Sequence, residues 1–121
     1  MPVKYMDWSE LVHEYDLDAK RLLPFDALKA PFEGAWCVVR PRTVSLWHEH
    51  HERELFIGIS GTAEVKMDEK IYPISKGDII AIPPYTHHCI INNGTNDFHM
   101  YSIWWDRALA LNYIEAAGEK S

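Results

Sequence analysis

Histidines are the residues of this sequence with the clearest capacity for chemistry. The chain has seven, and five of them lie in two clusters: the run HEHHERE at residues 48–54 and the pair HH at residues 87–88. Imidazole nitrogens and carboxylate oxygens bind divalent metal ions, so both clusters are candidates for one metal site. A His-x-His pair can equally lie on a solvated surface, and the first run could be an exposed charged edge.

Strand geometry favours the metal interpretation. Residues two apart share a face of a β-strand, so Val44, Leu46, His48 and His50 are expected on one face of the segment 43–50. His48, His50 and Glu54 can then point into one interior, while Glu49 and His51 point away. A buried carboxylate without a partner costs on the order of several kcal/mol or becomes neutral. A divalent ion held by imidazoles and this carboxylate would remove that cost and leave coordination positions open.

The first cluster belongs to a longer spaced motif. Residues 48–50 (HEH) are followed by three residues, Glu54, six residues and Gly61. Fifteen further residues lead to Gly77, where a second spaced motif begins. Both glycines are expected in turns, because glycine adopts a positive φ at little cost.

The second motif contains the other histidine pair. From Gly77 it runs through five residues to Pro-Pro-Tyr at 83–85, two residues, His88, three residues and Asn92. Strand alternation with Asn92 favours His88 as the inward histidine, and His87 stays the alternative.

The two motifs together resemble those of the cupin superfamily, over about residues 35–105. The departure is Tyr85, in a position where the family usually has glycine, so a different turn is expected before the histidine. The resemblance implies a double-stranded β-helix, which is a jelly-roll barrel open at one end. It implies one divalent metal ion, with zinc or iron expected first and manganese or nickel compatible. The four metal ligands that it implies are His48, His50, Glu54 and His88.

A cupin site does not by itself define a reaction. The first expectation is a metal-dependent enzyme for a small-molecule substrate, with the metal as Lewis acid or O2-activating centre and Glu54 as ligand or base. The run at 48–54, the following SGTAEV and the terminal WWD are similar to the cupin part of hydrazine-forming synthetases. That similarity implies zinc-dependent N–N bond formation beside a partner synthetase domain. A non-catalytic metabolite-binding or sensor cupin is the third alternative, and a homodimer is implied in each case.

The strand expected at residues 98–105 decides which further side chains reach the cavity. Alternation places inside either His99, Tyr101 and Ile103 or Phe98, Met100 and Ser102. In the first case Tyr101 is a candidate catalytic residue beside Glu54.

Short strands have to position these residues. Segments rich in β-branched and aromatic residues recur between turn signals, which predicts a sandwich or small barrel. The expected strands are AWCVVR (35–40), TVSLWHEH (43–50), ELFIGI (54–59), TAEVKM (62–67), KIYPI (70–74), DIIAI (78–82), HCIIN (88–92) and FHMYSIWW (98–105).

Helices are expected only outside this region. One is predicted over residues 7–15 with Asp7 as its cap, and another over residues 107–117 ending at Gly118. The sequence therefore predicts one all-β domain. It consists of an N-terminal helix and irregular arm (1–34), a barrel (35–106), and a C-terminal helix and tail (107–121).

The composition bounds the class of protein. A chain of 121 residues with 47% hydrophobic and 25% charged residues can bury the core of one globular domain. Its net charge of −6 disfavours nucleic acid or an anionic membrane surface as the main partner. No apolar run approaches the roughly 20 residues that span a bilayer. Two cysteines and the absence of a secretory signal pattern at the N-terminus predict a cytoplasmic protein.

Overall fold

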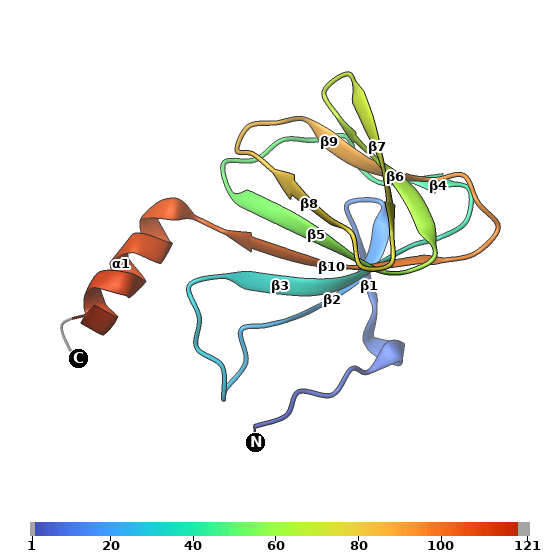
Figure 1. Cartoon of the computed structure of the whole chain (residues 1–121). Coiled ribbons are helices and arrows are strands. Elements are labelled where there is room, and N and C mark those ends of the chain that lie inside the picture. Colours follow the sequence, from blue (N-terminus) through green and yellow to red (C-terminus); the bar gives the residue numbers. More distant parts are fainter. Residues whose placement is uncertain (1, 119–121) are drawn as a thin grey trace.

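The structure is a computed structural model that describes residues 2–118, and its architecture is all-β, as expected (Figure 1). Two antiparallel sheets have the strand orders β1-β2-β3-β10-β5-β8 and β4-β9-β6-β7. The strands are β1 (Val12–Glu14), β2 (Leu17–Leu23), β3 (Glu33–Val39), β4 (Thr43–Val44), β5 (Arg53–Ser60), β6 (Thr62–Met67), β7 (Lys70–Ser75), β8 (Ile79–Ile82), β9 (His88–Asn92) and β10 (Phe98–Trp105).

The hydrophobic core combines residues of both sheets. Phe56 and Phe98 come from the six-stranded sheet and Val65 and Ile90 from the four-stranded one, and all four are buried. In β5 and β10 the neighbours of these residues along the strand are more exposed, because successive side chains of a strand point to opposite faces. Full burial of one such side chain stabilises the fold by about 1.5–3 kcal/mol, so the apolar alternation determines which face of each strand turns inward.

The predicted strands are confirmed with one exception. In the segment 43–50 only Thr43–Val44 forms a strand, and the expected inward face is wrong for its first half. Val44 and Leu46 are exposed and Ser45 is buried, whereas His48 and His50 face the interior. The backbone leaves regular strand geometry after Val44, so the alternation that predicted one common face does not persist.

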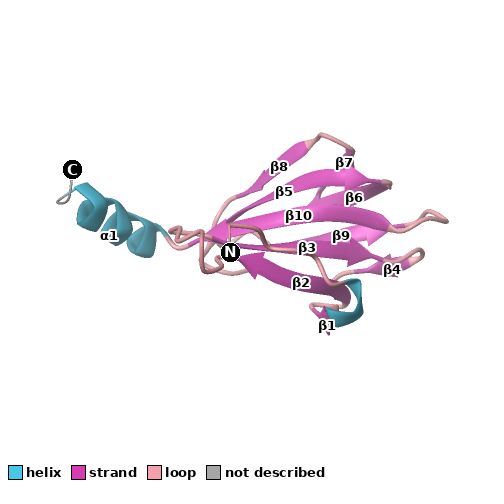
Figure 2. Cartoon of the chain, turned by 90° about the horizontal axis from the view of Figure 1, so that it is seen from below, coloured by secondary structure: helices cyan, strands magenta, loops and turns pink. Residues whose placement is uncertain are grey.

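The N-terminal segment differs from the prediction. A 3-10 helix covers only Trp8–Glu10, with its first N–H groups capped by Asp7, and the helix expected over 7–15 is wrong beyond that turn. Residues 12–23, placed by the sequence in a helix and an irregular arm, form β1 and β2 instead (Figure 2). Strand β2 pairs with β3 through five residue pairs, and this long-range pairing outweighs the weak local helix propensity.

The C-terminal helix is confirmed. Helix α1 (Arg107–Gly118) follows β10 after one residue and extends away from the two sheets (Figure 1). A hydrogen bond from Tyr113 Oη to the carbonyl of Lys29 connects it to the β2–β3 loop at 2.9 Å. Among residues 2–118, no helix is both long and apolar enough to cross a membrane.

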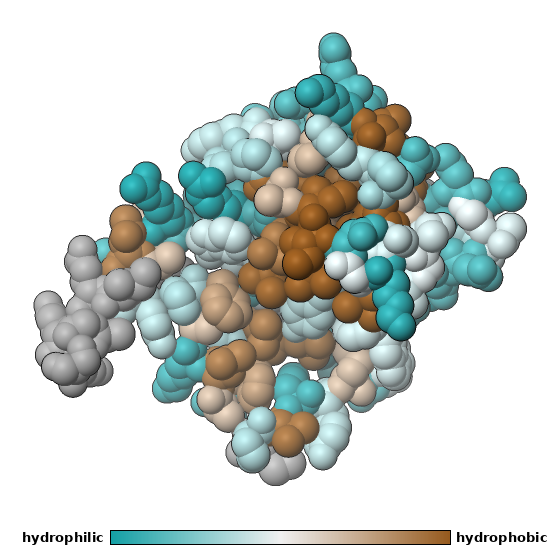
Figure 3. Space-filling model, in the orientation of Figure 1, coloured by the Kyte–Doolittle hydropathy of each residue, from teal (hydrophilic) through white to brown (hydrophobic). Residues whose placement is uncertain are grey.

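The six-stranded sheet also has apolar side chains on its outward face. Figure 3 shows apolar atoms gathered over β5, β8 and β10. Ile79 is 64% exposed, and Leu55 and Ile57 are half-buried. A homodimer, which stays a prediction here, could bury surface of this kind.

Candidate metal centre

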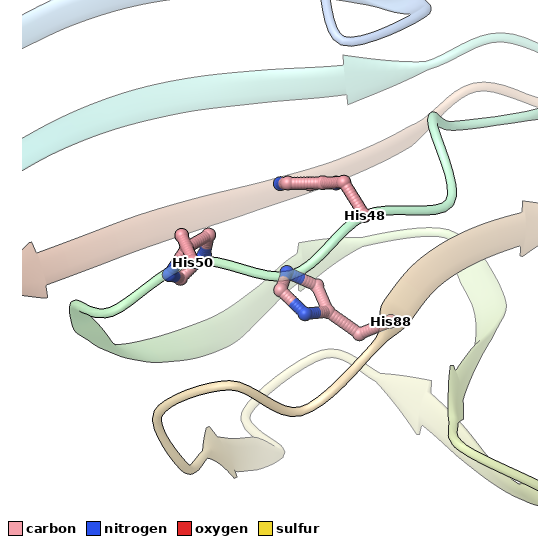
Figure 4. A group of neighbouring side chains, drawn as sticks. All are labelled: His48, His50 and His88. Atoms are coloured by element: carbon pink, nitrogen blue, oxygen red, sulfur yellow. The ribbon is translucent and has the colours of Figure 1, made fainter.

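Three imidazoles converge inside the barrel from two distant segments of the chain. His48 and His50 lie in the loop between β4 and β5, and His88 begins β9 (Figure 4). One ring nitrogen of each lies within 4.8 Å of the corresponding nitrogens of the others. The backbones of His48 and His88 exchange two hydrogen bonds, of 3.3 and 2.9 Å, which aligns the two segments.

Hydrogen bonds to the backbone orient all three rings in the same way. Nδ1 of His48 lies 2.9 Å from the carbonyl oxygen of Leu46, Nδ1 of His50 lies 3.0 Å from that of Glu52, and Nδ1 of His88 lies 2.8 Å from that of Thr86. A carbonyl oxygen only accepts, so each Nδ1 carries the proton and donates it. In the neutral rings Nε2 is therefore the nitrogen with a free lone pair, as in metal-ligating histidines.

Glu54 contributes a carboxylate to the same place. Its Oε1 lies 3.0 Å from Nε2 of His50 and 3.3 Å from Nε2 of His88, and its Oε2 accepts a hydrogen bond from Ser102. Burial acts to raise the pKa of Glu54, but these contacts outweigh it and lower the pKa to about 2. The carboxylate is thus ionised at neutral pH, in a largely enclosed position.

The three histidines differ in their electrostatic surroundings and in the hydrogen bonding of Nε2. Partial burial lowers the pKa of His48 and favours the neutral ring. The Glu54 carboxylate raises the pKa of His50, because it accepts a hydrogen bond from Nε2 when both ring nitrogens are protonated. Among the described residues 2–118, Nε2 of His88 is buried without a hydrogen-bond partner, although it faces the Glu54 carboxylate at 3.3 Å. A lone pair and a carboxylate oxygen repel each other unless a cation lies between them.

The residues present fit a divalent metal ion. Ligand atoms held about 2.1 Å from one ion lie about 3.0–3.4 Å from one another, and the two contacts of Glu54 Oε1 fall in this range. A cation would also satisfy the unpartnered Nε2 of His88. Three neutral imidazoles and a carboxylate suit zinc, iron, manganese and nickel.

The structure distinguishes His88 from His87. The ring of His88 is almost fully buried beside the other two histidines, whereas the side chain of His87 is 46% exposed. His87 stacks on Trp47 on the outside of the barrel, with ring centroids 5.6 Å apart. His51, expected to point away, contacts Asp106 at 2.8 Å and is also exposed.

A cavity of about 310 Å³ opens above the histidines. Its walls are largely apolar, and they include Leu17, Ala19, Ala35, Phe56, Ile90 and Met100. Charged side chains that are more exposed also line it. Arg21 donates to Glu14 at 2.8 Å and lies over the ring of Trp104, whose Nε1 donates to Glu33 at 2.6 Å.

Sequence reasoning did not find the part of this cavity that comes from β1 and β2. Glu14, Tyr15, Leu17, Ala19 and Arg21 all line it, although they precede the barrel predicted to begin at residue 35. The alternation of apolar and charged residues in LDAK was a short signal for a half-buried strand.

The structure has the second of the two alternatives for β10, in which Tyr101 faces away from the cavity. On β10 it is Phe98, Met100 and Ser102 that face inward, and the cavity lining includes Met100 and Ser102 but not Tyr101. Tyr101 packs edge-on against Trp36 on the other face of the sheet, with ring centroids 6.2 Å apart. The structure therefore argues against a catalytic role for Tyr101, because the core alternation of β10 turns its side chain away.

Tyr85, the departure from the expected second motif, has a left-handed backbone with φ 59°. This is a conformation that glycine adopts without strain and an aromatic residue rarely adopts. Its backbone N–H donates to the carbonyl of His50 at 2.8 Å, so the turn connects the two histidine segments.

The two antiparallel sheets and the three-histidine cluster place this chain in the class of small β-barrels with a candidate metal site inside. The family model for the cupin domain (Cupin_2) matches residues 35–104, and the chain belongs to this family. The plu4264 protein from Photorhabdus luminescens is 49% identical, with a TM-score of 0.87 over 96% of this chain and 97% of that one.

Two further solved structures are similar. A cupin 2 conserved barrel domain protein from Salinispora arenicola is 37% identical, with a TM-score of 0.87 over 96% of this chain and 98% of that one. A putative sugar phosphate isomerase from Acidithiobacillus ferrooxidans is 28% identical, with a TM-score of 0.64 over 74% of this chain and 59% of that one. The match to the Salinispora arenicola protein includes the N-terminal strands of this chain as well as the barrel.

Proposed function

We propose that this cupin is a metal-dependent enzyme acting on a small molecule. The observation that carries the proposal is the common hydrogen-bond pattern of three imidazoles, each with Nδ1 bonded to a backbone carbonyl, whose ligand nitrogens lie within 4.8 Å of one another beside a cavity. His48, His50 and His88 would hold the ion, and Glu54 would complete the ligand set or serve as a base. A bound divalent ion would supply Lewis-acid chemistry at a chelating oxygen, or activate O2 if it is iron.

The cavity supports a particular class of substrate. Its volume of about 310 Å³ is at the small end of ligand pockets. The apolar walls suit the body of a small metabolite, and the oxygens that chelate the metal would lie at the histidine end. At the more exposed end the carboxylates of Glu14 and Glu33 outnumber the guanidinium of Arg21. We therefore propose a substrate whose far end is neutral or basic, because a second anionic group would be repelled there.

The chain's own residues would prepare the site for turnover. Ser102 holds one oxygen of Glu54, which leaves the other directed at the histidines. The apolar walls exclude water from around the substrate, which strengthens electrostatic interactions at the histidine end. The similarity to a putative sugar phosphate isomerase supports an enzymatic role.

Elemental analysis of protein purified without oxygen tests this proposal, together with turnover and O2 consumption measured against a panel of small hydroxy and keto compounds. We expect about one metal ion per chain. His50→Ala should remove both the metal and any turnover. Wild-type protein without metal would refute the proposal. Metal and ligand binding without turnover would favour the non-catalytic alternative, and zinc with activity only beside a synthetase domain would favour N–N bond formation.

A further inference from the structure

The tight turn between β1 and β2 has an unusual residue in it. Glu14 pairs with Leu17, so Tyr15 and Asp16 form a two-residue hairpin loop, and both have positive φ, 53° and 57°. Turns of this kind favour Asn-Gly because both central residues are left-handed. A bulky aromatic residue there carries a backbone cost, and such strain persists in structures chiefly where function or packing requires the side chain.

The side chain of Tyr15 has a specific contact. Its ring stacks on the imidazole of His48, with centroids 5.0 Å apart and planes 26° apart, and it lines the cavity. Its carbonyl accepts a hydrogen bond from the N–H of Leu46 at 2.8 Å. The hairpin is therefore attached to the segment that carries His48, and the aromatic ring covers the half-exposed imidazole from the side of the cavity.

Tyr85 provides an internal comparison. It has nearly the same positive φ, 59°, and its backbone is also hydrogen-bonded to the first histidine segment. Its residue surface is 68% exposed, against 48% for Tyr15, and unlike Tyr15 it is not part of the cavity lining. The two tyrosines thus share the backbone strain and differ in whether the ring contacts a histidine of the cluster.

We propose that Tyr15 is a positioning residue of the metal centre, whose ring fixes the orientation of His48 and restricts access to the metal, and that the strained turn is retained for this purpose. The restriction of metal access rests on the function proposed above. The orientation of His48 does not, because the stacking is a property of the protein without metal.

The first test uses metal-free protein. Stacking should shift the ring-proton resonances of His48 upfield in a histidine-resolved NMR spectrum. This shift should be retained in Tyr15→Phe, which keeps the ring, and lost in Tyr15→Gly. Because glycine relieves the positive φ, Tyr15→Gly should keep a Tm within about 3 °C of the wild type. Tyr85→Gly is the matched control and should leave the His48 resonances in place.

The second test measures the rate at which a chelator, 4-(2-pyridylazo)resorcinol, removes zinc from the loaded protein. We expect removal to be at least about fivefold faster from Tyr15→Gly, and within about twofold of wild type from Tyr15→Phe and Tyr85→Gly, since only the first opens the stacked face.

The outcomes separate the two proposals. If His48 resonances do not move in Tyr15→Gly, or move equally in Tyr85→Gly, the positioning role is wrong. The positioning role is also wrong if the chelator removes zinc from the wild type and from Tyr15→Gly at the same rate. If the wild type binds no zinc, iron, manganese or nickel, the proposed function fails, and the NMR comparison still decides whether Tyr15 orients His48.

Discussion

The two ends of the cavity satisfy their polar groups in different ways. At the floor, formed by His48, His50, Glu54 and His88, ring nitrogens bond to backbone carbonyls and the carboxylate is enclosed. At the mouth, formed by the β1–β2 hairpin (residues 12–23), the polar contacts are ion pairs between exposed side chains, such as Arg21 with Glu14.

This difference determines how each region should respond to substitution. Removing a partner from a buried polar group leaves that group unsatisfied, at a cost of about 1–3 kcal/mol or more when it is charged. An exposed ion pair contributes about 0–1 kcal/mol, because water replaces the lost partner. We therefore expect abrupt effects at the floor and graded effects at the mouth, where the chain can change without losing the site.

The largest expected effect is the loss of metal from His88→Ala. The imidazole is almost fully buried, and within residues 2–118 its Nε2 has no hydrogen-bond partner, so this nitrogen is available to the ion. Since a supporting group alone is worth about 10–100-fold in metal affinity, we expect at least about 1,000-fold weaker binding, or about 4 kcal/mol. Isothermal titration with zinc measures it.

The adjacent histidine is the control for that substitution. His87 stacks on Trp47 outside the barrel, so His87→Ala should bind zinc as the wild type does. Equal loss of zinc from both variants would contradict the assignment of His88 to the floor.

Leu17→Ala tests whether the mouth can be weakened without affecting the floor. Leu17 is buried in the core cluster and lines the cavity from β2. Its truncation should lower the free energy of unfolding of metal-free protein by about 2–4 kcal/mol, measured by urea denaturation. The folded variant should still bind one zinc ion, and loss of zinc from it would show that the two regions are not separable.

Ser102→Ala should have a moderate effect at the floor. The hydroxyl donates to Glu54, and without it one carboxylate oxygen loses its hydrogen bond inside the barrel. We expect zinc affinity to fall by about 10–100-fold, measured by competition with a chelator. Ser60→Ala, at the exposed end of β5, is the matched control and should leave the affinity as it is. An unchanged affinity in Ser102→Ala would mean that Glu54 is held by other contacts.

The smallest expected effect concerns an ion pair that supports the mouth. The hydrogen bond from His13, with help from Arg40, lowers the pKa of Asp18 on β2. A carboxyl group whose pKa is lower in the folded state stabilises the fold above its unfolded pKa, and this contribution disappears as the pH falls through the folded pKa.

Asp18→Asn should therefore lower the free energy of unfolding at pH 7 by about 0.5–1 kcal/mol. The difference from wild type should diminish below the ordinary pKa of aspartate, about 3.9. Urea denaturation across this range measures it. A difference that stays constant with pH would show that the carboxylate charge does not contribute.

The floor of the cavity was largely predictable, because the sequence patterns that indicate it involve residues close together in the chain. The alternation of β5, β9 and β10 and the spacing of the two histidine motifs depend on residues close together in the chain. Those patterns placed His48, His50, Glu54 and His88 on inward faces, where the structure has them. Whether they bind a metal stays a proposal, and the choice between the two faces of β10 needed the packed core.

The mouth was not predictable in the same way. Residues 7–15 have an apolar pattern and a capping residue that predict a helix, and nothing within that segment indicates that it has a strand partner. Its strand β1 pairs with β2, and β2 in turn pairs with β3, where Ala19 lies opposite Cys37, a position far away in the chain. The same pairing brings Tyr15 and Arg21 to the cavity.

By itself the amino-acid sequence determined an all-β fold, because strand periodicity is a property of neighbouring residues. The jelly roll and the four candidate ligands were implied by the resemblance of its two motifs to those of cupins. Only the tertiary structure decided which face of β10 lines the cavity, that β1 and β2 complete its wall, and that Tyr15 covers His48. Those features depend on backbone pairing and packing between distant segments, whose free energy no short stretch of sequence contains.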